Sequence, residues 1–174
     1  LPQGALVVIA ARPAMGKTIL GEMAASLAAK DNGGAVFISA EMPRAALAMR
    51  SVSREASVSM QTMARGELGD HDIARLVEGV RRVGECGARL LIDDRSAPTC
   101  GHIRRVADRW HRKNAAATLR VLVVDYLQLV ATDNPRHSTY DRVSAASLGL
   151  LAIAKDLGLP VVALAQRSRK CEER

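Results

Sequence analysis

One stretch of this 174-residue chain decides its fold. It reads Leu6-Val7-Val8-Ile9-Ala10, followed directly by Ala11-Arg12-Pro13-Ala14-Met15-Gly16-Lys17-Thr18. The apolar run predicts a strand and the pattern after Thr18 predicts a helix, so the residues between them form a loop at a helix N-terminus. Backbone N–H groups and the helix dipole make such a loop an anion site. The stretch therefore predicts a phosphate-binding loop in degenerate form, with Ala11 where the first glycine usually stands.

The residue types of this loop suit a nucleoside triphosphate. Gly16 lets the main chain approach the phosphates. Lys17 would reach the β- and γ-phosphates, and the Thr18 hydroxyl would complete the Mg²⁺ shell. Pro13 has no N–H, so the donors should come mainly from Ala14 to Thr18. The alternative is a chance match, which is expected in about one chain in a hundred of this length. The flanking strand and helix patterns make chance rarer still.

Composition limits the class of protein. The chain is 48% hydrophobic and 25% charged, which is typical of one globular α/β domain with a sizeable core. No apolar run approaches 18 residues, so no membrane span is expected. The four aromatic residues exclude a ladder of base-stacking rings. A net charge of +7 is compatible with a nucleic-acid partner and equally with solvated helix faces.

The three cysteines give no metal-binding pattern. Cys86, Cys100 and Cys171 lie far apart, without paired spacing or a nearby histidine. We expect reduced thiols in a cytoplasmic protein.

Five strand candidates alternate with helix candidates along the chain. The strands are Ala5–Ala10, Ala35–Ser39, Arg89–Ile92, Leu119–Val124 and Val161–Ala165. Several are continuous apolar runs, which favours parallel strands covered on both faces. The alternation predicts an α/β fold, with a doubly wound, mostly parallel sheet and helices on both faces. Ligands of such sheets bind beyond the carboxyl ends of the strands.

The helix candidates have readable starts and faces. The first begins in the phosphate loop, ends at residues 31–34 and carries on one face Leu20, Met23, Ala24, Leu27 and Ala28. The second begins at Pro43, and the third has Asp70 as its cap. The third carries at helical spacing Ile73, Leu76, Val77, Val80 and Val83. The fourth follows Thr99, and its inward-facing residues are Ile103, Val106 and Trp110. The last runs from about Asp141 to Leu157.

Three polar residues follow predicted strands, where a triphosphate would lie. Asp125 would hold Mg²⁺ through water, although a strand-end Asp that caps a turn is the alternative. Glu41 could orient and deprotonate the attacking water, but the helix dipole alone also favours an acid there. Gln166 could contact the γ-phosphate and sense its loss, or be a plain polar strand end. The residues alone leave the last two choices evenly open.

The spacing of these motifs indicates a class of enzyme. Asp125 lies 108 positions after Lys17, with two predicted strands between them. Simple nucleotide kinases usually place the metal-binding acid earlier and have no Glu after the second strand. The pattern therefore indicates a motor-type ATPase. A phosphoryl-transfer kinase is the weaker alternative, because it needs an acceptor pocket that the sequence does not show.

Four strings together resemble the DnaB-type replicative helicases. They are Ala10-Ala11-Arg12-Pro13-Ala14-Met15-Gly16-Lys17-Thr18, Ser39-Ala40-Glu41-Met42-Pro43, Val123-Val124-Asp125-Tyr126-Leu127-Gln128-Leu129 and Pro160-Val161-Val162-Ala163-Leu164-Ala165-Gln166. The Ala-Arg-Pro-x-Met-Gly-Lys-Thr and Asp-Tyr-Leu-Gln strings are particular to that family. The resemblance covers nearly the whole chain in the right order, and it makes Ala11 a family trait.

The resemblance implies a RecA-like P-loop ATPase core, with residues 1–174 as a single domain that is incomplete at its C-terminus. It also implies a ring-shaped hexamer that moves along single-stranded DNA, with ATP and Mg²⁺ bound at subunit interfaces. By this likeness Lys17 and Thr18 bind phosphate and Mg²⁺, Glu41 is the catalytic base, Asp125 is the metal-binding acid and Gln166 is the γ-phosphate sensor.

The chain departs from the family pattern in two ways. Ala165 and Arg167 stand where Ser and Leu are common around the sensor Gln. The family's arginine finger, which contributes about 10³–10⁵ in rate, lies beyond the position of Arg174. We therefore expect weak ATPase activity and no strand separation from this polypeptide alone. Two interpretations stay open: an ATP-hydrolysing helicase core, or a nucleotide-binding module that acts through helicase subunits.

Overall fold

The protein is described from a computed structural model, which covers residues 1–87, 89–132, 136 and 138–167. Its strands form one sheet in the order β1-β5-β4-β2-β3, and every neighbouring pair is parallel. The strands are β1 (Leu6–Ala11), β2 (Gly33–Ser39), β3 (Leu90–Asp93), β4 (Thr118–Asp125) and β5 (Val161–Gln166). The carboxyl ends of all five strands therefore lie at the same edge of the sheet.

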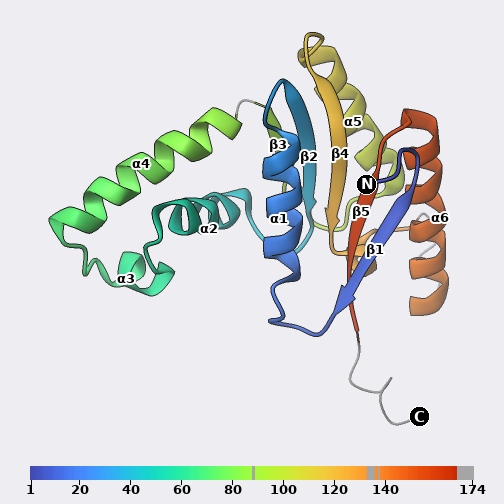
Figure 1. Ribbon diagram of the computed structural model, residues 1–174. Coiled ribbons are helices and arrows are strands. Elements are labelled where there is room, and N and C mark those ends of the chain that lie inside the picture. The colour runs from blue at the N-terminus through green and yellow to red at the C-terminus, as the bar shows by residue number, and fades with distance from the viewer. Residues whose placement is uncertain (88, 133–135, 137, 168–174) are drawn as a thin grey trace.

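Helices lie on both faces of this sheet and beyond its β3 edge. They are α1 (Lys17–Ala28), α2 (Arg44–Ala56), α3 (Met60–Arg65), α4 (Asp70–Gly87), α5 (Cys100–Lys113), the 3₁₀ helix η1 (Leu127–Leu129) and α6 (Thr139–Leu157). Helix α1 packs on one face, and α5 and α6 pack on the other (Figure 1). The predicted doubly wound α/β architecture is confirmed.

The core has two layers, one on each side of the sheet. The layer under α5 and α6 contains Ile103, Val106 and Trp110, which are all buried as predicted. The layer under α1 is smaller and contains Phe37 and Leu164. A strand such as β2, which is buried along its whole length, contributes side chains to both layers.

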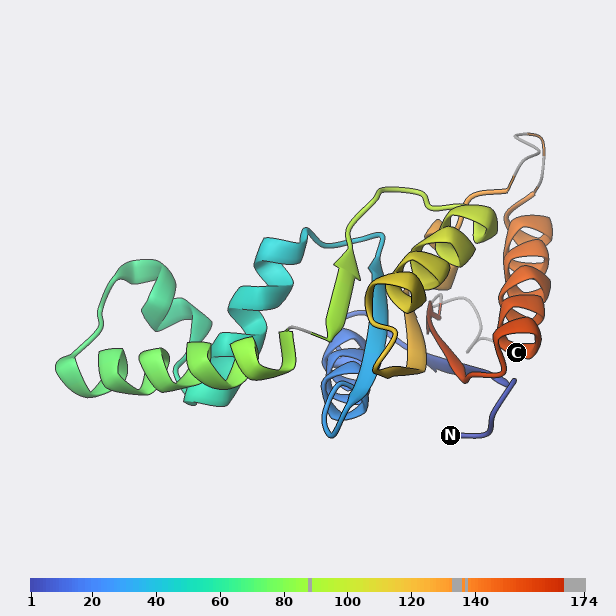
Figure 2. The ribbon, with the colours of Figure 1, turned by 90° about the horizontal axis from the view of Figure 1, so that it is seen from above.

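Helices α2, α3 and α4 form an arm that extends beyond the β3 edge of the sheet (Figures 1 and 2). Helix α3 is an addition to the expected elements. Helix α4 packs against α2; three of the five residues predicted on one apolar face are exposed: Ile73, Val77 and Val80. The expected apolar face is only partly covered because α4 stands outside the sheet layers. Asp70 is the first residue of α4 rather than its cap.

Helix α1 buries a different side from the one its large apolar residues indicate. Three residues of the expected face are exposed: Leu20, Met23 and Leu27. The small residues Gly21 and Ala25 are buried instead. A Cβ atom on Gly21 would lie 3.1 Å from Leu164 Cδ1 and from Val123 Cγ1. Small residues on this side let the helix lie close to the sheet.

Two further expectations concern cysteines and membranes. Cys100 is half-buried and donates its thiol hydrogen to the main-chain oxygen of Ala146 at 3.8 Å. Cys171 and the side chain of Cys86 lie outside the described residues. Among the helices of the described chain, none is both long enough and apolar enough to cross a bilayer.

Candidate nucleotide-binding and catalytic site

The predicted phosphate loop joins β1 to α1. Gly16, directly before the helix, has a φ of 81°, a left-handed conformation that glycine adopts without steric cost. Within the described chain, no side chain caps the first turn of α1 and no acidic residue lies in that turn. The N–H groups of this turn and the positive end of the helix dipole are therefore available to an anion.

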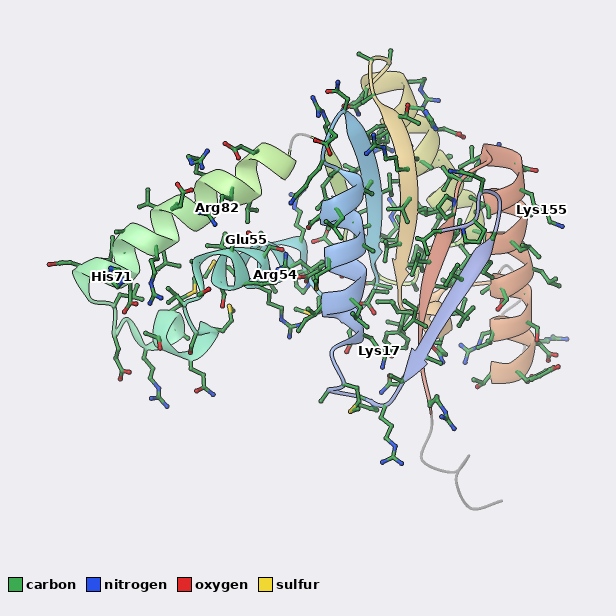
Figure 3. The ribbon with its side chains drawn as sticks, viewed as in Figure 1. Lys17, Arg54, Glu55, His71, Arg82 and Lys155 are labelled. Atoms are coloured by element: carbon green, nitrogen blue, oxygen red, sulfur yellow. The ribbon has the colours of Figure 1, made fainter. Side chains whose placement is uncertain are left out.

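Lys17 lies over this loop. Its ammonium donates hydrogen bonds to the main-chain oxygens of Ala11 at 2.8 Å and Arg12 at 3.1 Å. Figure 3 shows the side chain near the start of α1. Ala11 and Arg12 thus contribute carbonyl oxygens that position the lysine.

Thr18, in the first turn of α1, contacts Asp125 at the carboxyl edge of the sheet. Thr18 Oγ1 donates a hydrogen bond to Asp125 Oδ2 at 2.8 Å. Asp125 ends β4 and is almost fully buried. Burial raises the pKa of its carboxyl group, the hydrogen bond from Thr18 opposes that increase, and the nearby charge of Glu41 adds to it. A cation at this point would favour the ionised carboxylate.

The oxygen donors of Thr18 and Asp125 fit Mg²⁺. This ion is usually bound through one or two protein oxygens together with phosphate oxygens and water. The described residues contain no group of three or more His, Cys, Asp or Glu side chains that could hold a metal on its own. A magnesium ion brought in with a nucleotide is therefore the form of metal binding that these two residues suit.

A cleft of about 340 Å³ collects the predicted site residues. Its lining includes the side chains or backbone of Lys17, Thr18, Glu41, Asp125 and Gln166. The loop residues in the lining are Pro13, Ala14 and Gly16, whereas Ala11, Arg12 and Met15 are not among the lining residues. The arrangement follows from the parallel sheet, because β1, β2, β4 and β5 all end at this edge.

Arg50 also lines the cleft, and sequence reasoning missed it. It lies on α2, and its positive charge lowers the pKa of Asp125. No motif marks this arginine, because its place at the cleft depends on how the arm containing α2 meets the sheet. Together with Lys17, it gives the cleft two cationic groups that suit a polyphosphate.

A contact between an arginine of the arm and a buried glutamate of α1 ties the two together. Arg54 Nη1 on α2 lies 3.1 Å from Glu22 Oε2 on α1. Figure 3 shows Arg54 reaching from α2 toward α1. Glu22 is 5% exposed, and its other oxygen, Oε1, has no hydrogen-bond partner among the described atoms. Burial raises the pKa of Glu22 more than the charge of Arg54 lowers it.

We expect Glu22→Gln to reduce the pH dependence of stability. Above the ordinary pKa of 4.5, the unfolded Glu22 ionises while the folded one retains its proton. The free energy of unfolding of the native chain therefore falls as pH rises through this window, until the folded pKa is passed. The fall is about 1.4 kcal/mol for every pH unit that separates the two pKa values.

Urea unfolding between pH 4 and pH 7 measures this effect. The matched control is Glu67→Gln, because Glu67 is an exposed carboxylate. Equal slopes for native chain and Glu22→Gln would contradict the prediction. The pKa of Asp125 is also raised, so part of the pH dependence of stability should remain in both the native chain and Glu22→Gln.

Comparisons with known proteins decide the family. A family model described as the DnaB-like helicase C terminal domain matches residues 1–174. The chain belongs to this family. The replicative DNA helicase DnaB of Leifsonia xyli is 35% identical over 175 residues, which cover 100% of this chain and 37% of the relative. The DnaB of Geobacillus stearothermophilus is 32% identical over 171 residues, with 97% and 37% covered. The chain thus spans just over a third of the length of these relatives.

Solved structures agree on the fold of this DnaB-like domain. One solved ATPase domain has a TM-score of 0.88 at 28% identity, covering 100% of this chain and 61% of that chain. A structure of a DnaB-like replicative helicase and its interactions with primase has a TM-score of 0.87 at 28% identity, covering 99% and 41%. The predicted RecA-like ATPase fold is therefore confirmed, and with it the membership that the sequence strings indicate.

Proposed function

We propose that this chain binds Mg-ATP and hydrolyses it as the motor core of a DnaB-like replicative DNA helicase. The observation that carries the proposal is the Thr18–Asp125 hydrogen bond, at 2.8 Å, in a cleft that also contains Lys17, Glu41 and Gln166. This contact supports the proposal because the two residues proposed to hold magnesium lie in the same cleft as the residues proposed to bind phosphate and to activate water. A nucleotide-binding module would contain the same groups, so turnover decides between the two interpretations.

In this proposal the loop N–H groups and Lys17 bind the β- and γ-phosphates, while Thr18 and Asp125 hold magnesium. When bound, magnesium neutralises phosphate charge and polarises the terminal phosphorus. Glu41 accepts a proton from a water molecule as the water oxygen attacks that phosphorus, and ADP leaves. Gln166 contacts the γ-phosphate and responds to its loss.

Partners and location are proposed on the family alone. Family members include replicative helicases, so we infer that the complete protein acts as a homo-oligomer, a hexameric ring, on single-stranded DNA. The net charge of +7 is compatible with such an anionic partner. The cytoplasm is the compartment that suits this role.

Calorimetry with Mg-ATP tests the binding step, using the native chain and Lys17→Ala. Loss of the ammonium removes a charge-assisted contact to phosphate, so the affinity should fall at least about tenfold. The matched control is Lys30→Ala, an exposed lysine after the end of α1 that does not line the cleft; its affinity should stay within about twofold.

Turnover with and without single-stranded DNA then separates the two interpretations. DNA-stimulated hydrolysis that Lys17→Ala abolishes supports the enzyme. Binding without turnover, or turnover only after mixing with full-length helicase subunits, supports the module. No heat on titration of Mg-ATP into the folded native chain would contradict both.

A further inference from the structure

The last two residues of β5, Ala165 and Gln166, extend past the end of its neighbour β4. Pairing between these strands stops at Asp125 and Leu164, because the chain after Asp125 leaves the sheet and forms η1. On the other side, β1 stays paired with β5 as far as Ala11 and Gln166. Among the described strands, the main chain of Gln166 thus has a neighbour on one side only.

The side chain of Gln128 occupies the other side. Gln128 Nε2 donates a hydrogen bond to the main-chain oxygen of Gln166 at 2.8 Å. The main-chain N–H of Gln166 donates to Gln128 Oε1 at 3.2 Å. A side-chain amide carries the same donor and acceptor as a peptide group, so Gln128 continues the hydrogen bonding of β4 beyond its end.

Gln128 lies in the 3₁₀ helix η1, which is packed against the core. Its neighbour Leu127 and the following Val130 are both buried in the core. The turn is closed by main-chain hydrogen bonds from Leu129 N to Tyr126 O at 3.0 Å and from Val130 N to Leu127 O at 3.1 Å. The amide is therefore presented by a rigid part of the fold.

The other side of Gln166 connects to the phosphate loop. The N–H of Arg167 donates to the Ala11 oxygen at 3.1 Å, and the same oxygen accepts from Lys17 Nζ at 2.8 Å. The main chain at Gln166 and Arg167 is thus held between Gln128 and the residue that positions Lys17.

We propose that Gln128 is a positioning residue that clamps the main chain of Gln166 and so fixes the Gln166 side chain at the cleft. The inference rests on the proposed function, in which Gln166 contacts the γ-phosphate. Because this contact exists only with a triphosphate, the clamp should affect the hydrolytic step and leave the binding of ADP unchanged.

Steady-state kinetics of Gln128→Leu test whether the hydrolytic step is affected while ADP binding is not. Removing both hydrogen bonds should lower kcat for ATP about tenfold, with KM for ATP and Kd for ADP within about twofold of the native chain. The matched control is Gln61→Leu, an exposed glutamine on α3, which should leave all three unchanged. A parallel loss of ADP affinity, or an unchanged kcat, would overturn the proposal.

A double variant shows whether Gln128 acts through Gln166. In a Gln166→Ala background, Gln128→Leu should cause no further loss of kcat, since there is then no sensor side chain to position. Multiplication of the two separate losses would overturn the proposal.

Amide hydrogen exchange without nucleotide tests the clamp independently of catalysis. Gln128→Leu should speed exchange at the Gln166 N–H about tenfold, while Leu164, inside the sheet, keeps its rate. Unchanged exchange at Gln166 overturns the clamp whatever the kinetics show. If the native chain neither binds nor hydrolyses ATP, the proposed function fails, and this measurement alone decides whether Gln128 holds Gln166.

Discussion

Glu41→Gln is expected to lower ATP turnover by about 10²–10⁴-fold while Mg-ATP affinity stays within about twofold. Glu41 follows β2 and lies at the cleft with Lys17 and Asp125. A glutamine has the same shape but cannot accept the proton of the attacking water, so the loss falls on the chemical step. Single-turnover hydrolysis at saturating ATP, with calorimetry for binding, measures the two effects separately.

The control for this variant is Glu67→Gln, an exposed carboxylate in the arm, outside the cleft lining. Its turnover should equal that of the native chain. Full turnover by Glu41→Gln with intact binding would show that Glu41 is not the base. A large loss of affinity instead would mean that the carboxylate supports binding rather than proton transfer.

The positions of the candidate site residues could be predicted from the sequence where those residues directly follow or end a strand. Lys17 and Thr18 belong to a continuous strand–loop–helix string, so their positions follow from local structure. Asp125 and Gln166 directly end apolar runs, and a parallel sheet brings such ends to one edge. The Thr18–Asp125 contact, at 2.8 Å, joins two residues 107 positions apart, and the predicted topology alone places them together.

Sequence reasoning failed where tertiary packing decides. Arg50 lines the cleft because of the way α2 is oriented relative to the edge of the sheet, and no sequence pattern on α2 predicts that orientation. On α1, spacing identified a stripe of large apolar residues, but the close approach of Gly21 to the sheet selects a different side of the helix for burial. Periodicity reports that a helix has an apolar face; it does not report which face meets the core when small residues compete for it.

Gly33 and Gly34 show the same limitation at a strand boundary. As glycines they predict the end of the first helix, yet both belong to β2, whose pairing with β4 shifts register between Gly34 and Ala35. A side chain distant in the sequence explains the glycine at position 34, because the indole of Trp110 on α5 packs directly over it. Glycine is present here for space, not for a turn.

Gly34→Ala is therefore expected to destabilise the fold by about 3 kcal/mol or more, a large share of the typical stability of a domain. A Cβ atom at this position would lie 1.8 Å from Trp110 Cζ2 and 2.2 Å from Cη2. Trp110 is 2% exposed, and its Nε1 donates to the Arg89 oxygen at 3.2 Å, so the ring cannot move aside without losing packing and a hydrogen bond. Urea unfolding measures the loss.

Two further variants make this result specific to the clash. Gly84→Ala on α4, where a Cβ would meet nothing within 4 Å, should stabilise the chain by about 0.5–1 kcal/mol, because alanine is the better helix former. In a Trp110→Leu background, Gly34→Ala should cost much less than in the native chain, since the obstructing ring is gone. An equal cost in both backgrounds would mean that the strand itself requires glycine.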